Sequence, residues 1–98
     1  GKADTIAERL IVSPRAPFVF KIVHDMIPSA QLNDVEIRVQ CAKSKETLIE
    51  RPFLGSPSIY SVSSIPENCG MINISIFARA WSDQPDLKGE IRSIAILS

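Results

Sequence analysis

Hydrophobic and polar residues alternate most regularly in residues 33–41, near the middle of the chain. Val35, Ile37, Val39 and Cys41 share one parity, and the residues between them are charged or polar. Because successive side chains of a strand point to opposite faces, this spacing predicts a strand with one buried face and one solvated face. The other segments are then expected to pair with this strand or to cover its apolar face.

Comparable patterns along the rest of the chain predict further strands. They are separated by turns rich in proline, glycine and serine, and no segment has the pattern of a convincing amphipathic helix. The expected strands are residues 5–12, 17–24, 46–51, 58–62, 71–81 and 87–97. About seven short strands with such turns predict an all-β fold, a single antiparallel β-sandwich domain spanning residues 1–98.

Residues 5–12 also admit a helix. Asp4 and Thr5 are suitable capping residues, and the residues after them tolerate helix formation. Against this, Ile6, Leu10 and Val12 share one parity, as they would in a strand. The proline-containing residues 13–17 also stop the segment early, so the pattern favours a strand.

The amino-acid composition limits the kinds of molecule that this protein is expected to bind. The chain has 98 residues, 45% hydrophobic and 22% charged, which suits one folded domain and argues against disorder. Its formal net charge is zero, which argues against binding to nucleic acid or an anionic membrane. No run approaches the roughly 20 apolar residues of a transmembrane segment. A protein partner or self-association is therefore the expected kind of interaction.

Catalytic chemistry finds little support in the residue pattern. His24 is the single histidine and lies beside Asp25 at the end of an expected strand, where surface and capping roles are common. A nucleophile needs a base and a group that orients it, and no such set is evident. The chain has no glycine-rich phosphate loop, and His24 and the cysteines lack metal-ligand spacing. We expect no enzymatic activity, cofactor or metal.

The two cysteines leave two alternatives open. Cys41 ends the alternating strand, and Cys69 lies in the turn at residues 68–70. They either form one disulfide or remain as two separate thiols. A bridge would stabilise the domain by about 3–4 kcal/mol in the chain-entropy model. It would also indicate an oxidising compartment, periplasmic or extracellular.

Aromatic and basic residues mark one candidate contact patch. Phe77, Arg79 and Trp81 share a parity on the expected strand 71–81. Aromatic residues and arginine are favoured as binding anchors in protein interfaces. The alternative is that Trp81 covers an open end of the sandwich.

The second candidate patch lies on residues 17–24, which are largely apolar on both faces. Val19, Lys21 and Val23 lie opposite the face that carries two phenylalanines and an isoleucine. A strand of this kind is expected to be partly covered on its outer face or to lie at an interface. Residues 94–97 are likewise apolar, and an exposed apolar edge recruits partner strands by backbone pairing.

The order of features in residues 5–51 is similar to that of a known family. A strand at 6–12 is followed by Pro17-Phe18-Val19-Phe20, a loop at 27–32, the alternating strand 34–41 and a short strand at 46–50. This order resembles small bacterial lipoproteins, namely the YbaY-like proteins and the YscW type of type III secretion pilotin. The family places a strand like 71–80 before these features, whereas it follows them here. Either the order is permuted, or the second half of one unit precedes the first half of another, or the similarity is accidental.

The resemblance implies a pilotin-like β-sandwich that binds protein, in some members to guide an outer-membrane ring component. No catalytic or cofactor-binding residues come with it. The strand pattern by itself also fits an immunoglobulin-like sandwich. The expected function is therefore a non-enzymatic, protein-binding domain, as an envelope or secretion accessory. The alternative is a structural or adhesive module of a larger surface or extracellular protein.

Overall fold

The computed structural model of the protein describes residues 4–25, 35–53, 55–78 and 89–97. These residues form only β-strands among their regular elements, which confirms the predicted all-β class. The segment that also admitted a helix is a strand. The strands are β1 (Asp4–Val12), β2 (Phe18–His24), β3 (Val35–Cys41), β4 (Thr47–Pro52), β5 (Ser58–Val62), β6 (Met71–Ala78) and β7 (Ile91–Ile96).

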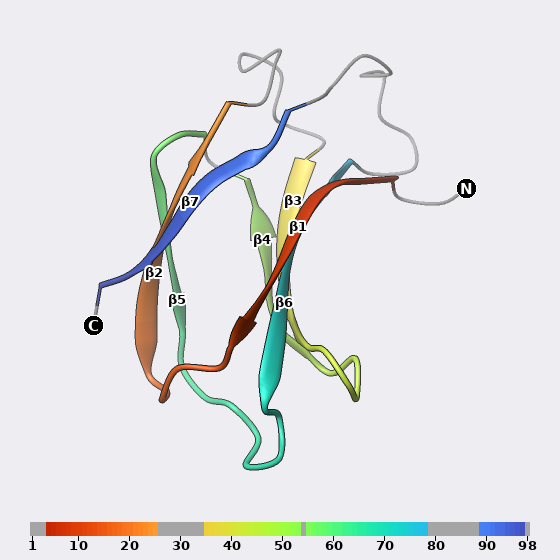
Figure 1. The fold of residues 1–98 in the computed structure, drawn as a ribbon, viewed down its shortest axis with the longest axis vertical. Coiled ribbons are helices and arrows are strands. Elements are labelled where there is room, and N and C mark those ends of the chain that lie inside the picture. Colours follow the sequence, from red (N-terminus) through yellow and green to blue (C-terminus); the bar gives the residue numbers. More distant parts are fainter. Residues whose placement is uncertain (1–3, 26–34, 54, 79–88, 98) are drawn as a thin grey trace.

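The strands form two antiparallel sheets that stack as a sandwich (Figure 1). The four-stranded sheet has the order β1-β6-β3-β4, and the three-stranded sheet has the order β5-β2-β7. The alternating strand that dominates the sequence, β3, lies inside the larger sheet between β6 and β4. In the smaller sheet β2 occupies the corresponding central place.

The first and last strands have exchanged places relative to an immunoglobulin constant domain. In that domain the first strand joins the sheet of the second and fifth strands, and the last strand joins the third and sixth. Here β1 pairs with β6, and β7 pairs with β2. The fourth strand differs as well, because β4 pairs with β3 and not with β5. The sandwich therefore has the predicted architecture with different places for its first, fourth and last strands.

The core lies between the sheets and follows the two-residue alternation of their central strands. In both β2 and β3, each second residue is buried and the residues between are half-buried. The largest apolar contributions come from β2, β3 and β6. These fully buried residues are Phe18, Phe20, Ile22, Val35, Ile37, Val39, Ile72, Ile74 and Ile76.

β1 does not keep the parity that its sequence indicates. The register against β6 shifts between Thr5 and Ala7, which inserts one extra residue into the strand. Ile6 still packs against the core, but Leu10 and Val12 are 55% and 73% exposed on the outer face. These three residues share one parity in the sequence but not one face of β1, because the extra residue reverses the alternation.

A disulfide joins Cys41, at the end of β3, to Cys69, in the turn before β6. Their Cα atoms are 5.2 Å apart, and both residues are buried. Of the two alternatives left open by the sequence, the structure has the bridge. Buried disulfides are typical of proteins that fold in an oxidising compartment outside the cytosol.

Candidate protein-binding surface

The central strand of the smaller sheet directs Val19, Lys21 and Val23 to the outer face. Their side chains point away from the core because the alternate residues of β2 are fully buried. All three are half-buried, since neighbouring strands flank them on both sides. The predicted contact residues of β2 therefore lie together on one surface.

Both neighbours of β2 extend this surface with mainly apolar side chains. Lys21 pairs with Ile59 of β5 on one side and with Ala95 of β7 on the other. Ile59 is 56% exposed, and Leu97, which follows β7, is 50% exposed. We call this surface the outer face of the small sheet; it comprises Val19, Lys21, Val23, Ile59, Ser61, Ser93, Ala95 and Leu97.

A hollow of about 340 Å³ adjoins this face where β4 and β5 border the two sheets. Arg51 and Pro52 line it from β4, and Ile59, Tyr60 and Ser61 line it from β5. Ile59 and Ser61 belong to both the hollow and the outer face. The apolar surface therefore continues around the β5 edge to an exposed arginine.

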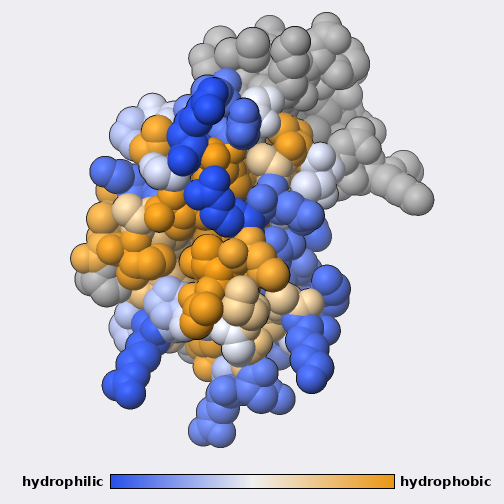
Figure 2. Space-filling view, viewed as in Figure 1, coloured by the Kyte–Doolittle hydropathy of each residue, from blue (hydrophilic) through white to orange (hydrophobic). Residues whose placement is uncertain are grey.

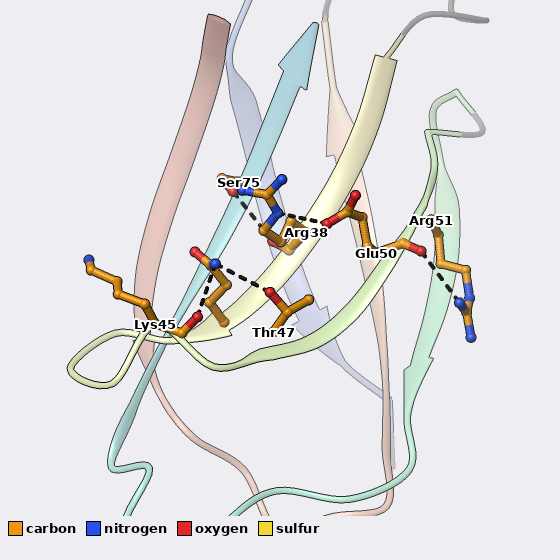
Figure 3. Close-up of polar contacts among 7 residues, drawn as sticks. Arg38, Lys45, Thr47, Glu50, Arg51 and Ser75 are labelled. Carbon is orange, nitrogen blue, oxygen red and sulfur yellow. Dashed lines mark hydrogen bonds and ion pairs between the residues drawn. The ribbon is translucent and has the colours of Figure 1, made fainter. Parts of the chain in front are cut away.

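The outer face of the four-stranded sheet is polar by contrast (Figure 3). Arg38 donates from Nε to Glu50 Oε2 at 2.9 Å, and Gln40 donates from Nε2 to Thr47 Oγ1 at 3.3 Å. Such cross-strand pairs satisfy polar groups within the sheet itself. The polar side chains over β3 and β4 therefore have partners within the sheet.

Among the described side chains of the four-stranded sheet, the exposed large apolar ones lie at one end. Leu10 and Val12 of β1 lie there, and Val12 pairs with Met71 of β6. Figure 2 shows apolar surface over the lower parts of β1 and β7, on the side of the molecule that faces the viewer. The cluster of Leu10, Val12 and Met71 on β1 and β6 is the natural comparison surface for any test of the small sheet.

Phe77 has a different environment from the one that its sequence pattern indicates. It is only 6% exposed, and the guanidinium carbon of Arg38 lies 4.4 Å from its ring centroid. The expected exposed anchor is therefore corrected to a buried ring covered by an arginine on β3, a cation–π contact. Arg79 and Trp81, the other members of that predicted patch, lie outside the described residues.

His24 faces the core and not an open cleft. It is 8% exposed, and its ring centroid lies 4.5 Å from that of Phe53. Its backbone N–H donates to Ser56 Oγ at 2.9 Å, which ties β2 to the loop before β5. Among the described residues, no group of histidine, cysteine and acidic side chains is arranged to hold a metal ion.

Asp25 fastens the end of β2 to the start of β7. The Glu90 N–H donates to Asp25 Oδ1 at 2.9 Å, and Arg92 forms an ion pair with the same carboxylate. The Glu90 N–H, followed by the Arg92 guanidinium, holds the pKa of the Asp25 carboxyl below its ordinary value of 3.8. The folded state therefore favours the ionised carboxylate.

This low pKa predicts a pH-dependent stability. A carboxyl whose folded pKa is depressed stabilises the fold above its unfolded pKa and loses that contribution as pH falls through the folded pKa. We expect Asp25→Asn to lower the melting temperature at neutral pH, with a difference from wild type that shrinks below about pH 4. Thermal melts across this range measure it, with Glu67→Gln in the β5–β6 turn as control. An Asp25→Asn difference that is constant with pH would contradict the assignment.

A larger hollow, of about 780 Å³, lies where the β1–β2 and β5–β6 connections meet. Residues 13–16 line one side, and Ile65, Pro66, Glu67 and Gly70 line the other. Arg15 and Glu67 are exposed there, whereas Ile65 packs against the core. The hollow is created by two connections distant in sequence, so no local pattern indicates it.

Comparison with known proteins assigns this chain to no family. No described helix is long and apolar enough to cross a membrane. No protein-family model, curated protein or solved structure matches the chain.

Proposed function

We propose that the protein is a non-enzymatic β-sandwich that binds another protein through the outer face of the small sheet. The observation that carries this proposal is the gathering of Val19, Val23, Ile59, Ala95 and Leu97 around a single cation, Lys21. Contiguous exposed apolar surface bordered by polar residues is characteristic of protein interaction sites. The outer face of the other sheet is polar over β3 and β4, and its exposed apolar residues lie on β1 and β6.

We place the protein in the bacterial envelope or the extracellular space, where it would act as an accessory of secretion. The buried disulfide supports an oxidising setting. The similarity of residues 5–51 to YbaY-like proteins and YscW-type pilotins supports a partner that is itself a protein, such as a subunit of an envelope assembly. The hollow beside β5 provides room for a partner side chain next to the apolar face.

A matched pair of substitutions tests this proposal. Ile59 on the small sheet and Leu10 on the four-stranded sheet are 56% and 55% exposed. Ile59→Glu and Leu10→Glu therefore make the same kind of change on the two opposite faces. We expect Ile59→Glu to weaken partner capture by about tenfold or more, since a carboxylate in an apolar interface is desolvated without compensation.

Capture is measured with immobilised wild-type and variant proteins in extract of the native source, followed by titration of the recovered partner. Leu10→Glu should bind as wild type does. Equal loss in both variants, or loss only in Leu10→Glu, would assign binding to another surface. If the wild type captures nothing reproducibly, the protein is better described as a structural or adhesive module of a larger protein.

A further inference from the structure

The edge strands of the two sheets differ in how well they are protected from pairing. An unpaired edge exposes backbone donors and acceptors, and proteins commonly block it with charge, proline, a bulge or a short strand. β4 carries Glu50 and Arg51 and ends at Pro52, and β5 has five residues. β1 carries two charged residues beyond its bulge. Each of these three edges therefore has a protective feature.

β7 is protected only at its beginning. Glu90 and Arg92 lie there, next to a register shift between Val23 and His24 of β2. From residue 93 to residue 97 the sequence is Ser-Ile-Ala-Ile-Leu, without charge or proline. No described strand lies beyond this edge, because β7 ends the small sheet.

The open backbone groups of this segment can be assigned from the ladder. Leu97 donates its N–H to the Val19 carbonyl at 2.8 Å, and Ala95 pairs with Lys21. In an antiparallel ladder the hydrogen-bonding groups of successive residues point to opposite sides. Residues 93, 95 and 97 therefore face β2, whereas Ile94 and Ile96 direct their N–H and C=O groups to the open edge.

We propose that two copies of the protein associate by antiparallel pairing of their β7 edges, with Ala95 on the two-fold axis. In this register Ile94 of one copy exchanges hydrogen bonds with Ile96 of the other, and Ser93 faces Leu97. The edge-facing N–H and C=O groups of Ile94 in each copy then lie opposite those of Ile96 in the other copy. The small sheets of the two copies then join into one continuous sheet.

The exposed side chains beside the β7 edge and the net charge of the chain are both compatible with a second copy of the protein at this edge. Ile96 is 44% exposed although it shares its parity with the core-facing Ile94, so each copy leaves apolar surface uncovered beside the edge. Pairing brings the Ile94 and Ile96 side chains of the two copies together on the same face. Arg92 lies outside the paired segment, and the zero net charge imposes no overall repulsion between copies.

A cross-linking experiment tests both the partner and the register. The two native cysteines are joined to each other, so a cysteine introduced at residue 95 carries the only thiol. Facing residues of a non-hydrogen-bonded antiparallel pair have Cα atoms about 4.5 Å apart, within disulfide range. We expect Ala95→Cys to form a covalent dimer under mild oxidation. Ser93→Cys should remain monomeric, because its two copies would lie about 13 Å apart.

Sedimentation equilibrium of the wild type and two proline variants provides the second measurement. Ile96→Pro removes an edge-facing N–H, and Ser61→Pro makes the equivalent change at the open edge of β5 in the same sheet. We expect concentration-dependent dimers for wild type and Ser61→Pro, with affinity reduced by about tenfold or more in Ile96→Pro. Ala95→Glu should also prevent association, because like charges would meet on the axis, and it leaves the core untouched.

Several results would overturn the inference. A wild type that stays monomeric, or that pairs at this edge only with a different protein, excludes a second copy as the occupant. Equal cross-linking of Ala95→Cys and Ser93→Cys excludes the register. The inference does not rest on the proposed function, since self-association is measured on purified protein and partner capture is measured with the Ile59→Glu and Leu10→Glu pair.

Discussion

Replacing Phe20 with alanine is expected to lower the free energy of unfolding by about 3–5 kcal/mol. Phe20 lies at the centre of the small sheet with no exposed surface. Its ring centroid is 6.0 Å from that of Phe18 and 5.6 Å from that of Tyr60. Truncation removes apolar contacts and leaves a cavity that the two surrounding rings can fill only in part. Urea unfolding followed by fluorescence or circular dichroism measures the loss.

An exposed residue of the same sheet provides the control. Ile59→Ala also shortens a large apolar side chain, but at a position that is 56% exposed, so we expect a change within about 0.5 kcal/mol. Similar losses in both variants would contradict the assignment of Phe20 to the core and of Ile59 to the outer face. Ile59 also lies on the proposed binding surface. Any loss of partner capture in Ile59→Ala could therefore be attributed to the surface, since the free energy of unfolding is expected to stay nearly unchanged.

Removing the disulfide by Cys41→Ala with Cys69→Ala is expected to lower the free energy of unfolding by about 3–4 kcal/mol. The two cysteines are 28 residues apart in sequence, so the bridge closes a long loop and restricts the unfolded chain. A domain of this size has a total stability of about 5–15 kcal/mol, so the change is a large share of the whole. Chemical denaturation of the oxidised wild type and the double variant measures it.

Reduction of the wild type provides an independent check of the disulfide. Under a strong reductant its unfolding midpoint should approach that of the double variant, because the closed loop is then open in both proteins. The double variant itself should not respond to the reductant. An unfolding midpoint of the wild type that is the same with and without reductant would show that the bridge does not contribute to stability.

The disulfide also affects the geometry of the larger sheet. Cys41 ends β3, and its partner precedes β6, which pairs with β3 along its whole length. The bridge therefore anchors the two central strands of this sheet at one end. The proposed binding surface lies on the other sheet, so stabilisation and recognition are assigned to different layers of the sandwich.

Local alternation predicted most of the strands, as β3 illustrates. The expected strand at residues 33–41 is observed as Val35–Cys41, with every second residue buried. The expected strand at 58–62 has the observed bounds of β5. This success has a simple cause: in a sandwich, each strand must place one set of alternate side chains between the sheets.

The candidate surface was partly predictable for the same reason. The opposite parity of β2 indicates Val19, Lys21 and Val23, and the apolar composition of residues 94–97 indicates the tail. The sequence does not indicate Ile59, because a lone isoleucine in a short strand does not reveal which strand lies beside it. Its position next to Lys21 depends on the pairing of β5 with β2.

Taken alone, the sequence determined the all-β class, the positions of the strands and the parity of the central ones, because these depend on neighbours within a few residues. Only the tertiary structure decided the reversed face of β1, the burial of Phe77 beneath Arg38 and the union of Cys41 with Cys69. It also decided that β1 joins β6 and β7 joins β2. These features arise from contacts between residues far apart in the chain, where one extra residue or a different neighbouring strand changes what a side chain faces.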